Sequence, residues 1–382
     1  MVFGLSALGA LAGAQAQSVA RGDPLQVTGG TAPCQRDADP ACLHRLSLPG
    51  GAGALAYYAS ASPGATVAPP TEALVVIHGY SRNVRASFRA GLQAAEGAQR
   101  AGRTLVVAPA FQVVPAQAQR CQSRGTPDVA PGDALWTCGG WAEGALSRGG
   151  GAPVGAFAAL DALIAELHRQ WPSLRTITLA GFSAGAQLVQ RSIGFAADAP
   201  PGVHLRYVVA APSSWLYFDA VRPQPQQGGQ SVDWAACGAG SAFPGDCTWR
   251  FVPPTVATCP EANRWKYGLQ NLPAHLGRTA AEARARYRAA DVRYLEGADD
   301  SAATRAAALD VLDRRCAAQL QGPFRLQRGV AYAAYERAVL QPPRPRPLAV
   351  VPGCGHDVGC VLPSDAARAA VFGDAPAAVP AR

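Results

Sequence analysis

Short apolar runs recur along the 382-residue chain and alternate with segments of helical periodicity. The runs at residues 73–77 and 104–108 are continuously apolar, which is typical of strands buried on both faces. Helical periodicity follows each of them, at about residues 86–100 and 152–171. Alternation on this scale predicts an α/β fold in which helices cover both faces of a mostly parallel, doubly wound sheet.

The pattern extends to both sides of these segments. We predict further strands at residues 55–59, 174–179, 205–210, 291–295 and 348–351, and further helices at 302–320 and 325–341. Residues 17–50 are predicted to be loop-like, because they are rich in Gly, Pro and Asp. Pro109 is predicted to end the strand at 104–108, since proline cannot donate a ladder hydrogen bond.

The alternation lapses once, between residues 211 and 290. This stretch is rich in Pro, Gly, Cys and Trp and shows little periodicity. A loop of such length inside a compact domain usually has a function. We therefore predict one domain over residues 17–382, in which about 211–290 form an insertion over the carboxyl edge of the sheet, held by its own disulfides.

The ten cysteines and the N-terminus point to export. So many thiols would be a liability in a reducing compartment, whereas an even number suits disulfides. Cys34 and Cys42, like Cys121 and Cys138, are close in sequence, but the pairing stays open. Residues 1–16 are predicted to be a signal peptide, because an apolar segment ends at Ala14-Gln15-Ala16. No Lys or Arg precedes Arg21, which is consistent with a start upstream of Met1.

The net charge and the lengths of the apolar runs limit the classes of partner that we expect. The net charge of +8 comes almost entirely from dispersed arginines, and Lys266 is the only lysine. No basic block resembles a nucleic-acid-binding arm, so we expect no nucleic-acid partner. No run after the predicted signal peptide is apolar enough to span a bilayer. We therefore expect a secreted or periplasmic protein without an integral membrane segment.

The stretch around Ser183 has the strongest chemical signature. A β-branched run leads into Gly181-Phe182-Ser183-Ala184-Gly185, and a helix-competent segment follows. A serine on a sharp turn between strand and helix presents its Oγ to solvent, and the two glycines let the flanking elements approach. Without these flanking segments, the same five residues could serve only the packing between a strand and a helix.

A serine hydroxyl needs a base and a group that orients the base. The predicted strand at 291–295 is followed by Glu296-Gly297-Ala298-Asp299-Asp300, and the strand at 348–351 by Pro352-Gly353-Cys354-Gly355-His356. Carboxyl ends of parallel strands share one edge of the sheet, so we expect these loops to meet near Ser183.

In these motifs and in their order the chain resembles the α/β-hydrolases, and more narrowly the secreted bacterial serine esterases with disulfides. The resemblance runs from about residue 55 to about residue 372 and includes His78-Gly79 after a buried strand. It implies an ester hydrolase that needs no cofactor or metal. Ser183 would be the nucleophile and His356 the general base and acid.

The resemblance also implies the remaining roles. The backbone N–H groups of Tyr80 and Ala184 would form the oxyanion hole, and His78 would shape that loop. The family spacing favours Asp300 as the triad acid, with Asp299 as the alternate. Either aspartate could instead cap the helix predicted at residue 302.

Several alternatives remain at this stage. Trp136 and Trp141 lie in loops rich in Gly and Cys, where they could line an acyl or aryl pocket or pack beneath the loop. A peptidase or amidase would use the same triad, and a non-catalytic binding protein could retain the fold. Cys354, His356, Asp357 and Cys360 resemble a metal-ligand cluster but lack a C-x-x-C pair. The expected substrate is a small or polymeric ester.

Overall fold

The computed structural model describes Met1 and residues 33–64, 68–148, 151–255 and 257–373. The predicted signal peptide lies outside these ranges except for Met1. The unit that contains the described residues from 33 onward is built on an eight-stranded sheet in the order β1-β2-β4-β3-β5-β6-β10-β11. The strands are β1 (Leu43–Ser47), β2 (Ala54–Ala59), β3 (Glu72–Ile77), β4 (Thr104–Ala110), β5 (Thr176–Phe182), β6 (His204–Ala210), β10 (Asp291–Gly297) and β11 (Leu348–Val351).

The pairing confirms the predicted sheet. β1 and β2 are antiparallel to each other, and β2 is antiparallel to β4, whereas all pairs from β4 to β11 are parallel. The β3–β5 register runs from Glu72 opposite Thr176 to Ile77 opposite Gly181. The next residues along the two chains, His78 directly after β3 and Phe182 at the end of β5, therefore lie side by side at the carboxyl edge.

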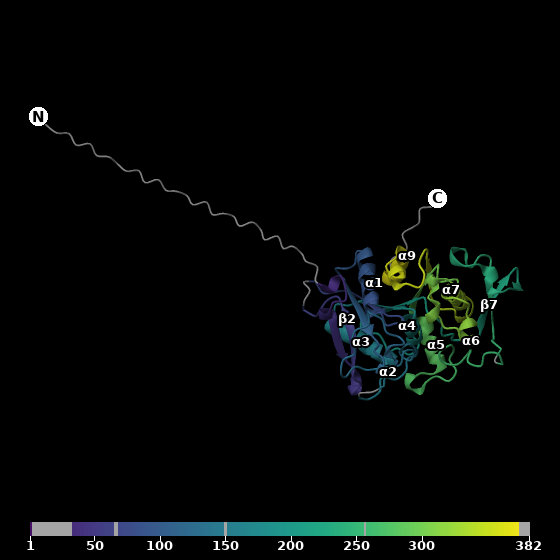
Figure 1. Cartoon of the computed structure of the whole chain (residues 1–382), viewed down its shortest axis with the longest axis horizontal. Helices are drawn as coiled ribbons and strands as arrows, with labels where there is room; N and C mark the ends of the chain where they lie inside the picture. Colours follow the sequence, from purple (N-terminus) through teal and green to yellow (C-terminus); the bar gives the residue numbers. More distant parts are fainter. Residues whose placement is uncertain (2–32, 65–67, 149–150, 256, 374–382) are drawn as a thin grey trace. The chain divides into compact units, whose positions relative to one another are not determined.

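Helices cover both faces of the sheet, as predicted. One face carries α1 (Val84–Gly97), α8 (Val358–Val361) and α9 (Asp365–Phe372), whose apolar side chains share a core with alternate residues of the strands. The other face carries α3 (Ala156–Gln170), α4 (Ala184–Ser192), α5 (Ala280–Ala289) and α7 (Arg325–Tyr335). Figure 1 shows α1 and α9 close together on their side of the sheet.

The predicted insertion contains more regular structure than its composition suggested. It forms a small antiparallel sheet in the order β8-β7-β9, made of β7 (Arg222–Gln227), β8 (Gln230–Ser231) and β9 (Thr248–Val252). In Figure 1, β7 lies at the opposite end of the unit from β2. Helix α5 closes the insertion and returns the chain to the main sheet.

Two boundaries differ from the sequence-based expectation. β1 lies within the stretch predicted to be loop-like, because its mixed, half-exposed residues suit an edge strand and lack an apolar run. β4 continues through Pro109 to Ala110. The β3–β4 ladder stops at Val107, so Pro109 is paired with β2 alone. With no β3 partner on its other side, a proline can be accommodated at this position.

The predicted helix at 302–320 is wrong. Two 3₁₀ turns, Arg305–Ala307 and Leu309–Val311, are separated by Ala308 in a left-handed conformation (φ 42°). Within the predicted range, only α6 (Cys316–Gln319) is an α-helix. The carbonyls of Ala306 and Ala307 accept hydrogen bonds from His356 and Arg325 instead of from a helix ladder. Contacts from distant residues thus replace the local structure that alanine-rich sequence favours.

All ten cysteines form disulfides. Three bonds close short loops outside the insertion: Cys34–Cys42, Cys121–Cys138 and Cys354–Cys360. A fourth, Cys237–Cys247, lies inside the insertion. The fifth, Cys259–Cys316, ties the insertion to α6. The insertion is therefore held partly by its own disulfide and partly by one that joins it to α6.

Candidate active site

Ser183 occupies the turn between β5 and α4 in a strained conformation, with φ 58° and ψ −116°. Its N–H donates to the carbonyl of Ala210, which ties the turn to β6. A Cβ at Gly181 would collide with the carbonyl oxygen of Gly185, and a Cβ at Gly185 with that of Ile77. Both glycines are thus required by close backbone approach, as the sequence pattern suggested.

His356 follows β11, and its ring reaches Ser183. His356 Nε2 lies 2.8 Å from Ser183 Oγ. The loop that carries the ring is closed by the Cys354–Cys360 disulfide, and the His356 N–H donates to the Ala306 carbonyl at 2.6 Å. These contacts hold a side chain that is only 5% exposed.

Asp300 is the carboxylate that the structure brings to His356. Asp300 Oδ2 lies 2.8 Å from His356 Nδ1, and the side chain is completely buried. Asp299 is exposed, and its N–H donates to Cys354 O. Neither aspartate caps a helix, because the first helical turn afterwards starts at Arg305, with Thr304 as its N-cap.

Arg325, at the start of α7, is a member of this group that sequence reasoning missed. Its Nη1 donates to Asp300 Oδ1 at 3.1 Å and to the carbonyl of Ala307 at 2.6 Å, and its side chain is completely buried. In the sequence it resembles any arginine on a helix surface. Only the tertiary structure shows that it contacts Asp300.

The electrostatics of this group follow from burial and from Arg325. Burial lowers the pKa of the His356 imidazole, and the Arg325 charge lowers it further, while Asp300 acts in the opposite direction. Glu296, also buried nearby, has no hydrogen-bond partner on either carboxyl oxygen. Burial and the Asp300 charge raise the pKa of Glu296 well above its ordinary value, which favours the neutral form of this carboxyl.

The loop after β3 lies against Ser183. A Cβ at Gly79 would come within 3.3 Å of Ser183 Cβ, so a larger residue would push this loop away. His78 is buried and accepts the Phe111 N–H through Nε2 at 3.2 Å, while its Nδ1 lies 2.8 Å from Gly79 O. Burial lowers the pKa of His78 to about 4, which keeps this ring neutral and the loop in place.

The two predicted oxyanion donors, Tyr80 and Ala184, line the same cavity as Ser183. Tyr80 belongs to the loop after β3, and Ala184 is the first residue of α4. The N–H of a first helical residue has no acceptor within its own helix and is therefore available to a ligand.

Trp136 and Trp141 occupy the core rather than a substrate pocket. Both are fully buried, and Trp136 Nε1 donates to the Ala145 carbonyl. Trp141 stacks on Phe111 and meets the His78 ring edge-on, with a centroid distance of 4.7 Å. They pack around Phe111 near the loop after β3, and neither lines the cavity described next.

A cavity of about 330 Å³ opens beside Ser183. Its walls combine apolar residues, among them Ala142, Ala184, Val311 and Leu312, with many polar and charged ones: Tyr80, Glu143, Ser183, Gln187, Ser213, Lys266, Asp310, Asp313, Arg314 and Arg315. Lys266 Nζ lies 2.7 Å from Glu143 Oε1, and Arg315 Nη2 lies 3.1 Å from Asp313 Oδ2. Although burial would raise the pKa of Glu143, the Lys266 charge lowers it, so this pair is ionic.

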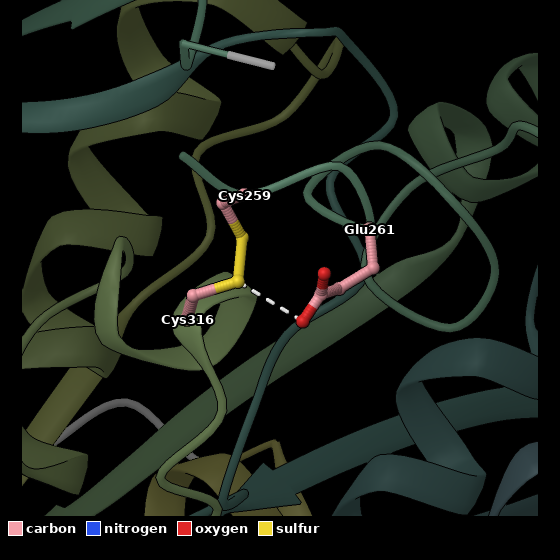
Figure 2. A group of neighbouring side chains, drawn as sticks. All are labelled: Cys259, Glu261 and Cys316. Atoms are coloured by element: carbon pink, nitrogen blue, oxygen red, sulfur yellow. Dashed lines mark hydrogen bonds between the residues drawn. A yellow bond between two sulfur atoms is a disulfide. The ribbon is translucent and has the colours of Figure 1, made fainter. Parts of the chain in front are cut away.

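The cysteine-containing clusters do not supply metal ligands in this structure. Cys354 and Cys360 share a disulfide, which removes both sulfurs as thiolates from the cluster around His356. A second group consists of Cys259, Glu261 and Cys316, where Glu261 Oε1 lies 2.9 Å from Cys316 Sγ (Figure 2). These two sulfurs also form a disulfide, so the group has one carboxylate and no thiolate.

Comparison with known proteins bears on the fold. No protein-family model matches the sequence, and no curated protein matches it. The poly(aspartic acid) hydrolase-1 of Sphingomonas sp. KT-1 aligns over 86% of this chain and 98% of its own, with 20% identity and a TM-score of 0.50. The LpqC poly(3-hydroxybutyrate) depolymerase of Bordetella parapertussis aligns over 88% of this chain and 92% of its own, with 20% identity and a TM-score of 0.53.

These similarities agree with the mostly parallel sheet and the helices on both of its faces. Sequence identity at this level supports the fold alone. The chain has the α/β-hydrolase fold, extended by a small disulfide-bonded antiparallel sheet.

Proposed function

We propose that the protein is a serine hydrolase that cleaves carboxylic esters through an acyl-enzyme intermediate. The observation that carries this proposal is the continuous hydrogen-bonded series from Ser183 Oγ through His356 to Asp300, with both contacts at 2.8 Å. An imidazole so placed can accept the serine proton while the carboxylate orients the ring and stabilises the imidazolium.

In the first half of the reaction, His356 Nε2 takes the proton from Ser183 as Oγ attacks the ester carbonyl. Collapse of the tetrahedral intermediate transfers this proton to the departing alcohol and leaves the acyl group on Ser183. In the second half, His356 deprotonates a water molecule that attacks the acyl-enzyme, and the proton returns to Ser183 as the acid departs.

The N–H groups of Tyr80 and Ala184 would stabilise the negative charge of both tetrahedral intermediates. Backbone donors held in place before the reaction need no reorganisation in the transition state. The buried His78 ring and Gly79 support this role, because they keep the loop after β3 close to Ser183.

Labelling with a fluorophosphonate probe tests the proposal. The wild-type protein should be labelled at Ser183 and should hydrolyse short 4-nitrophenyl esters, whereas Ser183→Ala should do neither. Ser173→Ala is the matched control, because Ser173 lies before β5 and its Oγ bonds the Pro70 carbonyl. A wild-type protein that is neither labelled nor active would favour the alternative of a non-catalytic binding protein.

Amide cleavage by the same triad is the second candidate function. The structural similarity to a protein named poly(aspartic acid) hydrolase-1 motivates it, and the similarity to a poly(3-hydroxybutyrate) depolymerase motivates polymeric esters. Release of soluble product from polyester films, and release of shorter chains from poly(aspartic acid), would distinguish these substrates from small esters. Turnover of 4-nitrophenyl esters without either release would restrict the proposal to small esters.

We propose a secreted or periplasmic location. Five disulfides require an oxidising compartment for their formation. Among the described residues, no helix has the length and apolar character needed to cross a membrane. Fractionation of the producing cells, with the N-terminus of the mature chain sequenced, tests the location and the predicted cleavage after residue 16.

A further inference from the structure

The cavity beside Ser183 contains a polar side chain whose orientation is determined by the protein. Gln187 lies four residues after Ser183 on α4, lines the cavity and is only 7% exposed. Its Oε1 accepts hydrogen bonds from Arg191 Nη2 at 2.8 Å and from Ser214 Oγ at 3.1 Å. Because a guanidinium has donors and no acceptor, the amide atom facing Arg191 must be the oxygen.

The Nε2 group of Gln187 is consequently directed away from Arg191. It donates to no acceptor within the described part of the chain, and it is not among the buried atoms sealed from solvent. A nearly buried amide with its oxygen fixed and its two N–H donors unused is costly unless water or a ligand accepts from it.

Lys266 supplies further donors to the same cavity. Its ammonium has three N–H groups, of which the Glu143 carboxylate, at 2.7 Å, can take one or two. Asp313 Oδ2 lies 3.7 Å away, which is too far for a hydrogen bond. Unused donors on Gln187 and Lys266 therefore line a cavity that begins at the candidate nucleophile.

We propose that this cavity selects esters carrying an additional carbonyl or carboxylate oxygen, which accepts a hydrogen bond from Gln187 Nε2 and a second interaction from Lys266. The proposal rests on the serine hydrolase function above and specifies its substrate class. An unsubstituted alkyl chain in the cavity would leave these donors unpaired in contact with apolar groups. Sites built to bind a polar group discriminate strongly against analogues that lack it.

The variant Gln187→Glu separates this role from a structural one. A glutamate keeps an oxygen acceptor for Arg191 and Ser214 but replaces the donor that faces the cavity with an acceptor. Gln93→Glu is the matched control, because Gln93 is exposed on α1, on the other face of the sheet.

Two pairs of esters report the effect. One pair differs in the acyl group, 4-nitrophenyl hexanoate and 4-nitrophenyl methyl succinate. The other differs in the alcohol, butyl acetate and the acetate of methyl glycolate. In at least one pair, Gln187→Glu should lower kcat/KM for the oxygenated ester at least about tenfold relative to its alkyl partner. Changes below about threefold in both pairs would overturn the proposal.

A binding measurement keeps this test independent of catalysis. Ser183→Ala should bind monomethyl succinate in calorimetric titration, and addition of Gln187→Glu should weaken binding about tenfold, whereas Gln93→Glu should not. Equal binding by Ser183→Ala with and without Gln187→Glu, or no binding at all, would refute the role of Gln187. Absence of ester turnover and of fluorophosphonate labelling in the wild type would instead refute the proposed function.

Discussion

The guanidinium of Arg325 lies 3.1 Å from the carboxylate of Asp300, on the side opposite His356, and both side chains are completely buried. This ion pair places a positive charge directly behind the proposed triad. A hydrogen bond from Arg325 to Asp300 Oδ1 leaves Oδ2 for the His356 ring. Arg325 therefore acts as a positioning residue that also contributes to the electrostatics of the imidazole.

Replacement of Arg325 separates these two contributions. Arg325→Gln removes the charge and leaves Asp300 as a buried, uncompensated carboxylate, so we expect the free energy of unfolding to fall by about 3–5 kcal/mol. Arg325→Lys keeps the charge but loses the fixed fork of donors, so kcat should fall while the pH midpoint of kcat/KM stays close to the wild-type value. Denaturant unfolding and pH–rate profiles of both variants test this. Equal pH midpoints in wild type and Arg325→Gln would exclude an electrostatic role.

The two neighbouring aspartates should differ sharply in their effect on activity. Asp300→Asn should lower kcat roughly 10³- to 10⁴-fold, because an amide cannot stabilise the imidazolium and favours the wrong tautomer. Asp299→Asn should change kcat less than about threefold, since its side chain is exposed and makes no contact with His356. Steady-state kinetics on one ester, after both variants have been shown to fold, would decide between them. A larger loss for Asp299→Asn would reverse the assignment.

The acidic limb of kcat/KM should report the His356 imidazole. The ring acts as a base only when neutral, and its pKa lies below the ordinary value of 6.5 because of burial and of the Arg325 charge. The limb should therefore have a midpoint below pH 6.5. The charged and titratable groups around the ring are Asp300 from the β10 loop, Arg325 from α7 and Asp357 from its own loop.

Glu296→Gln is the control for this pH profile. Burial and the Asp300 charge favour the neutral form of the Glu296 carboxyl, so we expect the isosteric amide to leave the charge near His356 unchanged. The midpoint of the Glu296→Gln profile should match that of the wild type. A shift of the limb toward lower or higher pH would show that Glu296 is ionised.

Protonation of His78 should make folding depend on pH. The folded-state pKa is about 4 and the ordinary value is 6.5, so between these pH values the unfolded chain binds more protons than the folded one. The stability contribution of the neutral ring is complete above pH 6.5. About 3 kcal/mol should be lost by pH 4, at about 1.4 kcal/mol per pH unit. Urea unfolding between pH 4 and 7 should show this slope, and His78→Gln should reduce it.

The Cys259–Cys316 disulfide should contribute more to stability than the disulfide within the insertion. It closes a loop of 57 residues, against 10 for Cys237–Cys247, and chain entropy then predicts about 4 against about 3 kcal/mol. The bond also joins the chain segments that carry Lys266 and Arg315, two residues that line the cavity. Unfolding of the two double Cys→Ala variants tests the order. A larger loss for the Cys237–Cys247 pair would contradict the chain-entropy argument.

A good part of the fold followed from local pattern. The apolar runs placed β3, β4, β5, β6 and β11 within a few residues. For β3 and β4 the reason is burial on both faces, which requires a strand that is apolar almost throughout. The helix at 302–320 failed for the opposite reason. Its alanine-rich composition favours a helix locally, yet the carbonyls of Ala306 and Ala307 bind His356 and Arg325, which are distant in sequence.

For the site, the sequence by itself determined which residue types follow which strands, because the glycines at the serine turn and the loop positions of His356 and Asp300 obey local steric and topological rules. Only the tertiary structure brought Asp300 rather than Asp299 to His356, buried Trp136 and Trp141 near the loop after β3, and brought Arg325 and Gln187 close to these residues. Each of these outcomes depends on side-chain packing between segments far apart in the chain, and no local pattern of hydrophobic and polar residues encodes such contacts.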